Sequence, residues 1–214
     1  MRPHSENQHK QHMIVVIDYG MGNLRSVSKA LELLGAPVKV SDKPADVEQA
    51  HKLILPGVGS FPAAMQELSS RNLIEPVKKA IAAGKPYLGI CLGLQLLFES
   101  SEEGAGSGLN VLPGRVRRFS TEKSGLKVPH MGWNQIHRRR EDCPLLNGIP
   151  DESFFYFVHS YYPVPAVSSY TVLETDYGGP FASMVWNKQV FATQFHPEKS
   201  QTVGLQLLKN FVDL

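Results

Sequence analysis

The feature that most constrains this chain is a strand that runs directly into a helix, with a cysteine between two glycines at the junction. The segment reads Gly89-Ile90-Cys91-Leu92-Gly93, after an apolar run and before an apolar helical pattern. A turn this sharp presents its central side chain at the end of a sheet, and the glycines leave room for the flanking chain. Backbone N–H groups at the start of a helix favour a thiolate. We therefore predict an α/β fold in which Cys91 is presented as a nucleophile.

The first half of the chain alternates short β-rich runs with helical patterns, which is typical of parallel strands joined by crossover helices. Strands are predicted over 13–18, 37–40, 52–55 and 86–90. Apolar spacing predicts a helix over 24–34 that ends at Gly35, and a second helical pattern over 63–83 that is closed by Gly84. The expected architecture is a three-layer sandwich with a mostly parallel central sheet.

After about Gly104 the pattern changes to short strands separated by glycine, proline and asparagine. These strands are predicted over 114–119, 154–158, 170–174, 183–186 and 190–195. We expect them to extend the sheet or to add an antiparallel layer, and we expect a closing helix over 202–211. Residues 13–214 are interpreted as one domain, and residues 1–12 as a polar N-terminal extension.

Composition excludes several classes of function. The 214 residues carry a formal charge of only +2, which gives no electrostatic reason to expect nucleic acid or an anionic membrane as a partner. No apolar run approaches the roughly 20 residues that span a bilayer, so we expect a soluble, cytoplasmic protein. The two cysteines form no metal-binding or disulfide pattern. We therefore predict neither a metal nor a cofactor.

A nucleophilic thiolate needs a partner that donates a proton to the leaving group and later activates water. His196 is the best candidate because it lies in the sequence His196-Pro197-Glu198. Pro197 biases His196 toward an extended conformation, in which residues two apart lie on the same side, so Glu198 can orient the imidazole. Alone this triplet more often indicates a surface ion pair. Together with Cys91 it predicts a catalytic triad of Cys91, His196 and Glu198.

The tetrahedral intermediate of such a reaction needs two hydrogen-bond donors for its oxyanion. The backbone N–H of Leu92, the residue after the nucleophile, is one predicted donor. The second is expected from the turn Pro56-Gly57-Val58-Gly59, through Gly59 or Val58, because its glycines permit close approach and unusual backbone angles.

Three other reactive side chains were weighed against this triad. His130 and His159 are alternative bases, but neither has a carboxylate at short spacing, so both are interpreted as structural. Cys143 precedes a proline in a loop-like stretch without a nearby base, and is interpreted as an incidental thiol.

Three motifs together resemble the class I, or triad, glutamine amidotransferases. They are Gly-Ile-Cys-Leu-Gly around Cys91, Pro-Gly-Val-Gly at 56–59 and Gln-Phe-His-Pro-Glu-Lys-Ser at 194–200. Within that class the chain looks like the glutaminase subunits of imidazole glycerol phosphate synthase, an enzyme of histidine biosynthesis. The motifs that carry this narrower resemblance are Asp18-Tyr19-Gly20-Met21-Gly22-Asn23-Leu24, His130-Met131-Gly132-Trp133-Asn134 and Tyr156-Phe157-Val158-His159-Ser160-Tyr161-Tyr162.

The resemblance implies hydrolysis of L-glutamine to glutamate and ammonia through a Cys91 thioester. It also implies that the substrate is held by Gly57, Gln95, Ser160 and Tyr161. Gln95 lies one helical turn beyond Cys91 and could face the cleft, although a polar residue satisfied within the core remains an alternative.

Use of the ammonia requires a second polypeptide, because the chain carries neither a phosphate-binding loop nor a dinucleotide motif. The resemblance implies a heterodimer with a cyclase subunit, a (β/α)8 barrel that makes imidazole glycerol phosphate and aminoimidazole carboxamide ribonucleotide. It places four residues at that interface: Asn23, Trp133, Tyr156 and Lys199. Trp133 could equally be a core aromatic. We expect the partner to activate a sluggish glutaminase through a two-state loop at 56–59.

Three other functions remain open from the sequence. The chain could be a glutaminase that serves another synthase, such as one making anthranilate, guanylate or pyridoxal phosphate. It could be a catalytically silent binding subunit, although no triad member is missing. It could also be a cysteine peptidase with a similar sheet.

Overall fold

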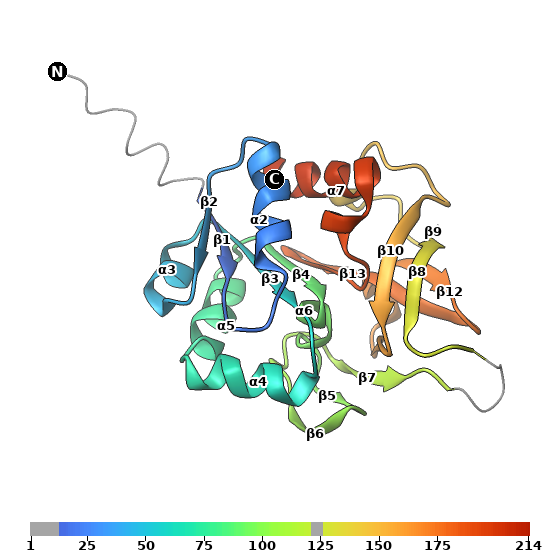
Figure 1. The fold of residues 1–214 in the computed structure, drawn as a ribbon, viewed down its shortest axis with the longest axis horizontal. Helices are drawn as coiled ribbons and strands as arrows, with labels where there is room; N and C mark the ends of the chain where they lie inside the picture. The colour runs from blue at the N-terminus through green and yellow to red at the C-terminus, as the bar shows by residue number, and fades with distance from the viewer. Residues whose placement is uncertain (1–12, 121–125) are drawn as a thin grey trace.

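The computed structural model describes residues 13–120 and 126–214, so the predicted extension over residues 1–12 lies outside the described residues. Within the described part, an eight-stranded sheet runs through the molecule with helices on both faces (Figure 1). The strand order is β2-β1-β3-β4-β14-β13-β12-β9. The first five strands are parallel and the last three are antiparallel. The predicted α/β fold with a mostly parallel central sheet is confirmed.

The four strands predicted in the first half are all present. They are β1 (Ile14–Ile17), β2 (Val38–Ser41), β3 (Lys52–Gly57) and β4 (Tyr87–Cys91). Strands β1, β3 and β4 are buried along their whole length. A parallel sheet covered on both faces requires apolar residues along the whole strand, since successive side chains point into the core on one face and then the other.

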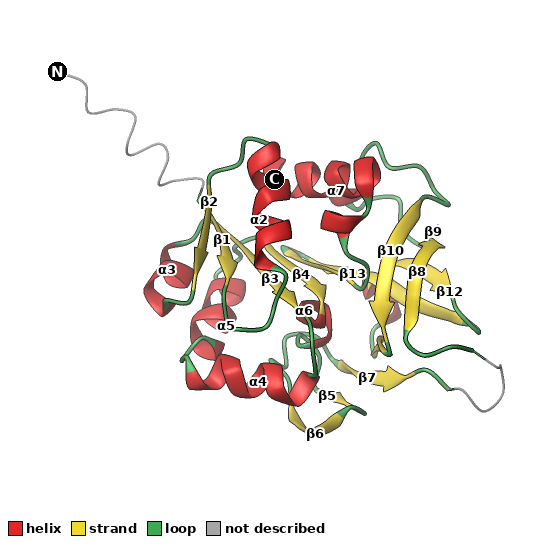
Figure 2. Ribbon diagram, viewed as in Figure 1, coloured by secondary structure: helices red, strands yellow, loops and turns green. Residues whose placement is uncertain are grey.

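Helices cover both faces of the large sheet (Figure 2). The buried side chains form two separate apolar cores, one on each face. One face is covered by α2 (Leu24–Leu33) and α7 (Gln201–Asp213), and the other by α3 (Pro44–Gln49), α4 (Phe61–Ser70) and α5 (Ile74–Ala82). Strand β1 shows the division, because Ile14 and Val16 join the first core whereas Val15 and Ile17 join the second. The predicted helices over 24–34 and 202–211 are confirmed.

The helical pattern predicted over 63–83 is two helices instead of one. Asn72 adopts a left-handed conformation, with φ of +56°, between α4 and α5. Asparagine tolerates this conformation better than most residues, and it stops a helix by turning the chain. The apolar spacing continues across the break, so the pattern did not reveal it. The short helix α3 was also not predicted.

The second half both extends the sheet and adds smaller ones. Strands β12 (Thr171–Asp176), β13 (Pro180–Asn187), β14 (Val190–Thr193) and β9 (His137–Arg138) continue the large sheet. In the described residues, β8 (His130–Gln135) pairs with β10 (Phe154–His159), and a further sheet has the order β11-β7-β5-β6. Its strands are β11 (Tyr161–Pro165), β7 (Gly114–Arg118), β5 (Ser100–Ser101) and β6 (Gly104–Ser107).

Strands β8 and β11 were not predicted, because their sequences contain residues that disfavour strands. Gly132 interrupts β8, and two prolines, Pro163 and Pro165, lie in β11. Pairing with β10 and β7 overrides these local preferences. Short helical turns complete the chain: α6 (Leu92–Gln95), η1 (Pro144–Leu146), η2 (Ser168–Tyr170) and η3 (Pro197–Lys199).

Candidate active site

The carboxyl ends of three neighbouring parallel strands meet at one edge of the sheet. Strand β4 ends at Cys91, between β3, which ends at Gly57, and β14, which leads into His196. The register pairs Gly57 with Cys91 and Ile90 with Thr193. Ligands bind outside the carboxyl ends of strands in such sheets. This pairing therefore brings together residues that lie up to about 140 positions apart in the chain.

Cys91 sits on a strained strand-to-helix turn. Its φ of +55° and ψ of −107° are unusual for a residue with a side chain. The glycines on either side are required by packing. A Cβ on Gly89 would lie 2.6 Å from the carbonyl oxygen of Gly93, and a Cβ on Gly93 would lie 1.8 Å from that of Leu55. The following helix α6 is a single turn, shorter than the apolar helix expected from the sequence.

Within the described part of the chain, the Cys91 sulfur takes part in hydrogen bonds with Val158 and Gln194. The thiol donates to the Val158 carbonyl oxygen at 3.8 Å, and the Gln194 side-chain amide donates to Sγ at 3.7 Å. Gln194 is fully buried, and sequence reasoning did not identify it as part of the site. A signal was available, because Gln194 is a polar residue two positions before His196, at the end of the strand predicted over 190–195.

His196 and Glu198 form a buried pair. His196 Nδ1 lies 2.8 Å from Glu198 Oε1, and both side chains are 2% exposed or less. His196 is extended as expected, with φ of −99° and ψ of 97°. Glu198, however, reaches the ring because the 3-10 turn η3 folds the chain back toward His196. The expectation that Glu198 reaches the ring because the chain is extended through both residues is therefore wrong. Pro197 at the first position of η3 favours this turn.

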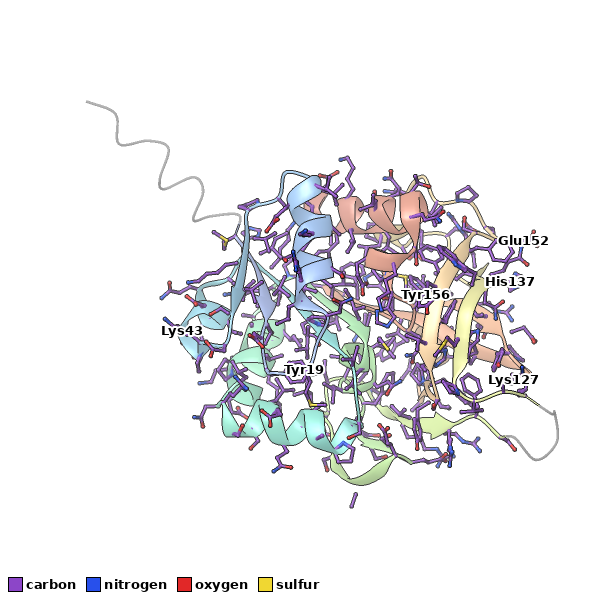
Figure 3. The ribbon with its side chains drawn as sticks, viewed as in Figure 1. Tyr19, Lys43, Lys127, His137, Glu152 and Tyr156 are labelled. Atoms are coloured by element: carbon purple, nitrogen blue, oxygen red, sulfur yellow. The ribbon has the colours of Figure 1, made fainter. Side chains whose placement is uncertain are left out.

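The backbone of His196 is fixed on both sides. Its N–H donates to the carbonyl oxygen of Tyr156 at 2.9 Å, and the Ser200 hydroxyl donates to its carbonyl oxygen at 2.6 Å. Figure 3 shows Tyr156 on β10, beside the segment that leads into α7. Strand β10 and the start of α7 therefore hold the imidazole at the edge of the sheet.

The electrostatics of His196 favour a proton on its ring. Its Nε2 has no hydrogen-bond partner among the residues that the structure describes. Burial lowers the pKa of His196, but the negative charge of a Cys91 thiolate, with the hydrogen bond and charge of Glu198, outweighs burial and raises the pKa to about 10. The imidazolium can therefore persist beside the sulfur at neutral pH.

The turn after β3 lies against the nucleophile. Val58 and Gly59 line the same cleft as Cys91 and Leu92. Gly59 has φ of +99°, which favours glycine. Gly57 is required by packing, because a Cβ there would lie 2.3 Å from the Tyr19 hydroxyl oxygen and 2.9 Å from Leu92 Cβ. The described residues that line the cleft do not include Gly57.

Tyr19 is a second site neighbour that sequence reasoning missed. Its side chain is buried directly after β1, and Figure 3 labels it. Its hydroxyl has no hydrogen-bond partner within the described ranges. Burial, and the charge of nearby Cys91, raise the pKa of Tyr19 well above its ordinary value. Tyr19 therefore acts as a neutral group beneath the turn that carries Val58.

The cleft has a volume of about 250 Å³, which suits a molecule of amino-acid size. It is lined by Val58, Gly59, Cys91, Leu92, Gln95, Glu103, Pro129, Val158, His159, Ser160 and Tyr161. It thus brings together most of the residues predicted for the nucleophile, the oxyanion and the substrate. Glu103 was not predicted, and its carboxylate already accepts the Phe61 N–H at 2.7 Å.

Gln95 is tied to the protein through its amide nitrogen. It is 4% exposed, and Nε2 donates to the Tyr161 carbonyl oxygen at 2.9 Å and to Gln194 Oε1 at 3.2 Å. Both N–H groups of the Gln95 amide are thus satisfied within the protein, as the alternative interpretation from sequence expected. The side-chain oxygen Oε1 is the atom of Gln95 that remains for a ligand.

His130, His159 and Cys143, which we interpret from the sequence as non-catalytic, have environments that suit structural roles. Burial lowers the pKa of His130 to about 4 and of His159 to about 3, so both rings are neutral near pH 7. Burial raises the pKa of the Cys143 thiol to about 11, and Cys143 is not among the cleft residues described above.

Comparison with known proteins places this geometry in a family. Residues 15–214 match the family described as glutamine amidotransferase class-I. The chain belongs to the class I glutamine amidotransferase family.

Relatives of this amidotransferase are named imidazole glycerol phosphate synthase subunit HisH. The chain is 54% identical to the subunit of Syntrophotalea carbinolica, with 94% of this chain and 100% of that protein covered. It is 52% identical to the subunit of Synechococcus elongatus, with 93% and 92% covered.

Solved structures share its fold at low sequence identity. PurLQS from Thermotoga maritima aligns with a TM-score of 0.74 at 20% identity, with 95% of this chain and 98% of that chain covered. The glutaminase domain of Trypanosoma brucei CTPS with bound acivicin aligns with a TM-score of 0.64 at 14% identity, with 94% of each chain covered.

Each of the four residues expected at a partner interface of this amidotransferase is at least partly exposed. Trp133 is 46% exposed, so the alternative of a core aromatic is wrong. It pairs with Tyr156 across β8 and β10, with ring centroids 6.0 Å apart, and Lys199 Nζ lies 5.7 Å from the centre of the Tyr156 ring. Asn23 immediately precedes α2, which packs against η3, the turn that carries Lys199.

Residues 13–120 and 126–214 contain no group of three or more histidine, cysteine, aspartate or glutamate side chains arranged to hold a metal ion. No helix in these ranges has both the length and the apolar character needed to cross a membrane.

Proposed function

We propose that the chain is the glutaminase subunit of an imidazole glycerol phosphate synthase and hydrolyses L-glutamine to glutamate and ammonia. The observation that carries this proposal is the strained Cys91 in a small cleft, next to a buried His196 that Glu198 holds at 2.8 Å. Identity above 50% to HisH subunits over nearly the whole chain supports the choice of this synthase over others.

The proposed reaction proceeds in two halves. The Cys91 thiolate attacks the side-chain carbonyl carbon of glutamine, and the resulting oxyanion collapses to break the C–N bond. His196 gives its Nε2 proton to the departing nitrogen, so ammonia leaves and a glutamyl thioester remains. Water then attacks the thioester, with His196 taking its proton, and glutamate and the thiolate are released. Glu198 keeps the Nδ1 proton in place and stabilises the imidazolium.

The cleft supplies groups for the oxyanion and for the rest of the substrate. The backbone N–H of Leu92 and that of Val58 or Gly59 are proposed as the oxyanion donors. Glu103 is proposed to bind the α-ammonium group, because it contributes a carboxylate to the cleft wall. Gln95, Ser160 and Tyr161 are proposed to contact the glutamine directly.

Gly57 is proposed to act on the substrate only through the position of the Val58 turn, because a side chain at position 57 would point at Tyr19 and Leu92. Residues 13–214 are proposed to form one class I glutamine amidotransferase domain, and residues 1–12 are proposed to contribute nothing to catalysis. The reaction as written needs neither a metal nor a cofactor.

The partner is proposed to be the cyclase subunit, a (β/α)8 barrel, bound as a heterodimer in the cytoplasm. The surface formed by Trp133, Tyr156, Lys199 and Asn23 is proposed as its docking site. Its occupancy is proposed to reorient the turn at 56–59, so that glutamine is hydrolysed only when an ammonia acceptor is bound.

Release of glutamate from glutamine, with and without the cyclase subunit and its acceptor, tests the proposal. Cys91→Ala is expected to lower the rate by more than about 10³-fold, since the nucleophile of a triad is lost. Cys143→Ala is the matched control and is expected to keep the wild-type rate. Equal rates for wild type and Cys91→Ala would refute the thioester mechanism, and equal rates with and without the partner would refute activation.

The same assay separates the alternatives. Hydrolysis of peptides but not of free glutamine would indicate a peptidase. Absence of turnover even with the cyclase would indicate a silent subunit. Activation by a different synthase, together with failure to bind the barrel subunit, would assign the glutaminase to another pathway.

A further inference from the structure

Two buried histidines lie in contact with each other at one wall of the cleft. His159 lines the cleft, and its Nε2 lies 2.9 Å from Nδ1 of His130. The His130 ring is stacked between Phe157 and Tyr177, with centroid distances of 4.8 Å and 4.0 Å. Neither ring has a role in the glutaminase mechanism described above.

The hydrogen bonds of this pair have one possible direction. A carbonyl oxygen can only accept, so His159 Nδ1 donates to the Tyr161 carbonyl oxygen at 2.8 Å. Because the rings are neutral, His159 Nε2 must then accept from His130 Nδ1. His130 Nε2 accepts in turn from the Asn134 amide at 3.2 Å. Both histidines are therefore expected as Nδ1–H tautomers.

The Tyr161 carbonyl oxygen links this pair to the nucleophile. It accepts a second hydrogen bond from Gln95 Nε2, whose other N–H goes to Gln194 Oε1. Gln194 then donates from Nε2 to Cys91 Sγ. The path from His130 to the sulfur consists entirely of buried or half-buried polar groups.

We propose that His130 and His159 are positioning residues for the Cys91 nucleophile, acting through Tyr161, Gln95 and Gln194. Rotation of the Gln194 amide by half a turn would aim its carbonyl oxygen at the sulfur anion and repel it. Gln95 prevents that rotation because its N–H holds Gln194 Oε1, and Gln95 cannot turn over without placing its own oxygen against two acceptors. The His130–His159 pair holds the Tyr161 carbonyl that sets the orientation of Gln95.

A catalytic role for either histidine fits this geometry less well. Both nitrogens of each ring are engaged, and no carboxylate contacts either ring among the described residues. A proton added to His159 Nε2 would face the Nδ1–H of His130 and break the pair. The proposal rests on the proposed function, because it concerns the nucleophile of the same site.

The first test needs no variant. Two-dimensional ¹⁵N NMR of the imidazole nitrogens in the full chain at pH 7 is expected to show His130 and His159 as neutral Nδ1–H tautomers. An Nε2–H tautomer of His159 would overturn the proposal, because its Nδ1 could then not donate to Tyr161.

The second test measures the reactivity of Cys91 toward iodoacetamide, with the modified peptide followed by mass spectrometry. Gln194→Leu removes the donor to the sulfur anion and is expected to slow alkylation by about tenfold. His130→Phe keeps a ring for the stack but removes the donor to His159, and is expected to slow alkylation by about threefold.

Tyr177→Phe is the matched control. It changes the same aromatic stack but removes only a hydroxyl that bonds to the Lys127 carbonyl, outside the path to Cys91. It is expected to leave alkylation unchanged. Wild-type alkylation in His130→Phe, or equal slowing in Tyr177→Phe, would overturn the proposal.

Alkylation does not require turnover, so the outcomes of the two proposals are distinguishable. Slow alkylation in His130→Phe with no glutamate release from the wild type would refute the proposed function alone. Glutamate release by the wild type, together with unaltered alkylation in His130→Phe, would refute only the positioning role.

Discussion

Cys91 holds a backbone conformation that residues with a Cβ seldom adopt, and the surrounding packing enforces it. Such strain persists only where neighbouring contacts over-determine the chain. Here the close approach of α6 to β3 and β4 provides those contacts, and the result is a sulfur aimed at a cleft instead of at the core. Gln194, which donates to that sulfur, and the nearby His196 are as buried as the core itself.

Glu198→Gln tests the orientation of the imidazole. A glutamine amide could donate to Nδ1 and stabilise the wrong tautomer of His196, and it carries no charge to stabilise the imidazolium. Glutamate release is expected to fall by roughly a hundredfold to ten-thousandfold. Glutamine affinity, measured by calorimetry, is expected to stay near the wild-type value. A wild-type rate in this variant would show that Glu198 does not orient the base.

Cys91→Ala is expected to lower the pKa of His196. Burial alone lowers the pKa below the ordinary value of 6.5, and the charge of Cys91 is a main factor that raises it to about 10. In NMR titrations the wild-type ring should therefore stay protonated until the pH approaches 10, and the ring of the variant should lose its proton at a lower pH. The same midpoint in both proteins would mean that no thiolate–imidazolium pair forms.

At the level of elements, the tight crossing of α6 over β3 fixes the elbow. Gly93→Ala would place a Cβ 1.8 Å from the Leu55 carbonyl oxygen, and it is expected to destabilise the protein by at least about 3 kcal/mol. Gly35→Ala is the control, because it has φ of +73° but no atom within 4 Å, and should cost only about 1–2 kcal/mol. Urea denaturation measures both, and equal losses would contradict the packing argument.

The last helix is fastened to the central sheet by a buried lysine. Lys52 of β3 donates from Nζ to the Phe211 carbonyl oxygen at 3.0 Å and to that of Val212, at the end of α7. Burial lowers the pKa of Lys52, yet its charge favourably faces the negative end of the helix.

Lys52→Met is expected to reduce the free energy of unfolding by about 1–3 kcal/mol. Lys209→Met is the matched control, since Lys209 makes only an exposed ion pair with Asp213, and its loss should cost no more than about 0.5 kcal/mol. Thermal denaturation followed by circular dichroism compares the two variants. Equal stability of the two variants would mean that the hydrogen bonds from Lys52 to the end of α7 do not stabilise the protein.

At the scale of the whole molecule, the proposed docking surface lies next to the candidate catalytic groups. The Tyr156 ring meets the Trp133 ring edge to face on the outside, while the Tyr156 carbonyl oxygen accepts the N–H of His196 inside. A partner that moves β10 can therefore move the base.

Trp133→Ala is expected to weaken binding of the cyclase subunit by roughly tenfold or more, because large exposed aromatics dominate interface energies. Isothermal titration calorimetry measures the affinity. Leu33→Ala is the control, since Leu33 is 79% exposed at the opposite end of α2 from Asn23. Unchanged affinity in Trp133→Ala would place the interface elsewhere.

Many residues of the candidate site could be predicted from local sequence patterns. The glycines around Cys91, the proline after His196 and the carboxylate of Glu198 each act within a few residues, so the elements that hold them could be predicted. Strands β8 and β11 could not, because long-range pairing outweighs their glycine and prolines. The left-handed Asn72 was hidden by an apolar spacing that continued through it.

The sequence by itself determined the alternation of strands and helices, the sharp turn at Cys91 and the identity of the three candidate catalytic groups, because these depend on backbone preferences and apolar periodicity. Only the tertiary structure decided that β14 lies beside β4, on the side away from β3. The neighbouring strands bring Val58, Cys91 and His196 to one edge of the large sheet. Glu103, which follows β5, and His159, on β10, reach the cleft from the two smaller sheets. Contacts between distant segments depend on how the layers pack, which no local preference specifies.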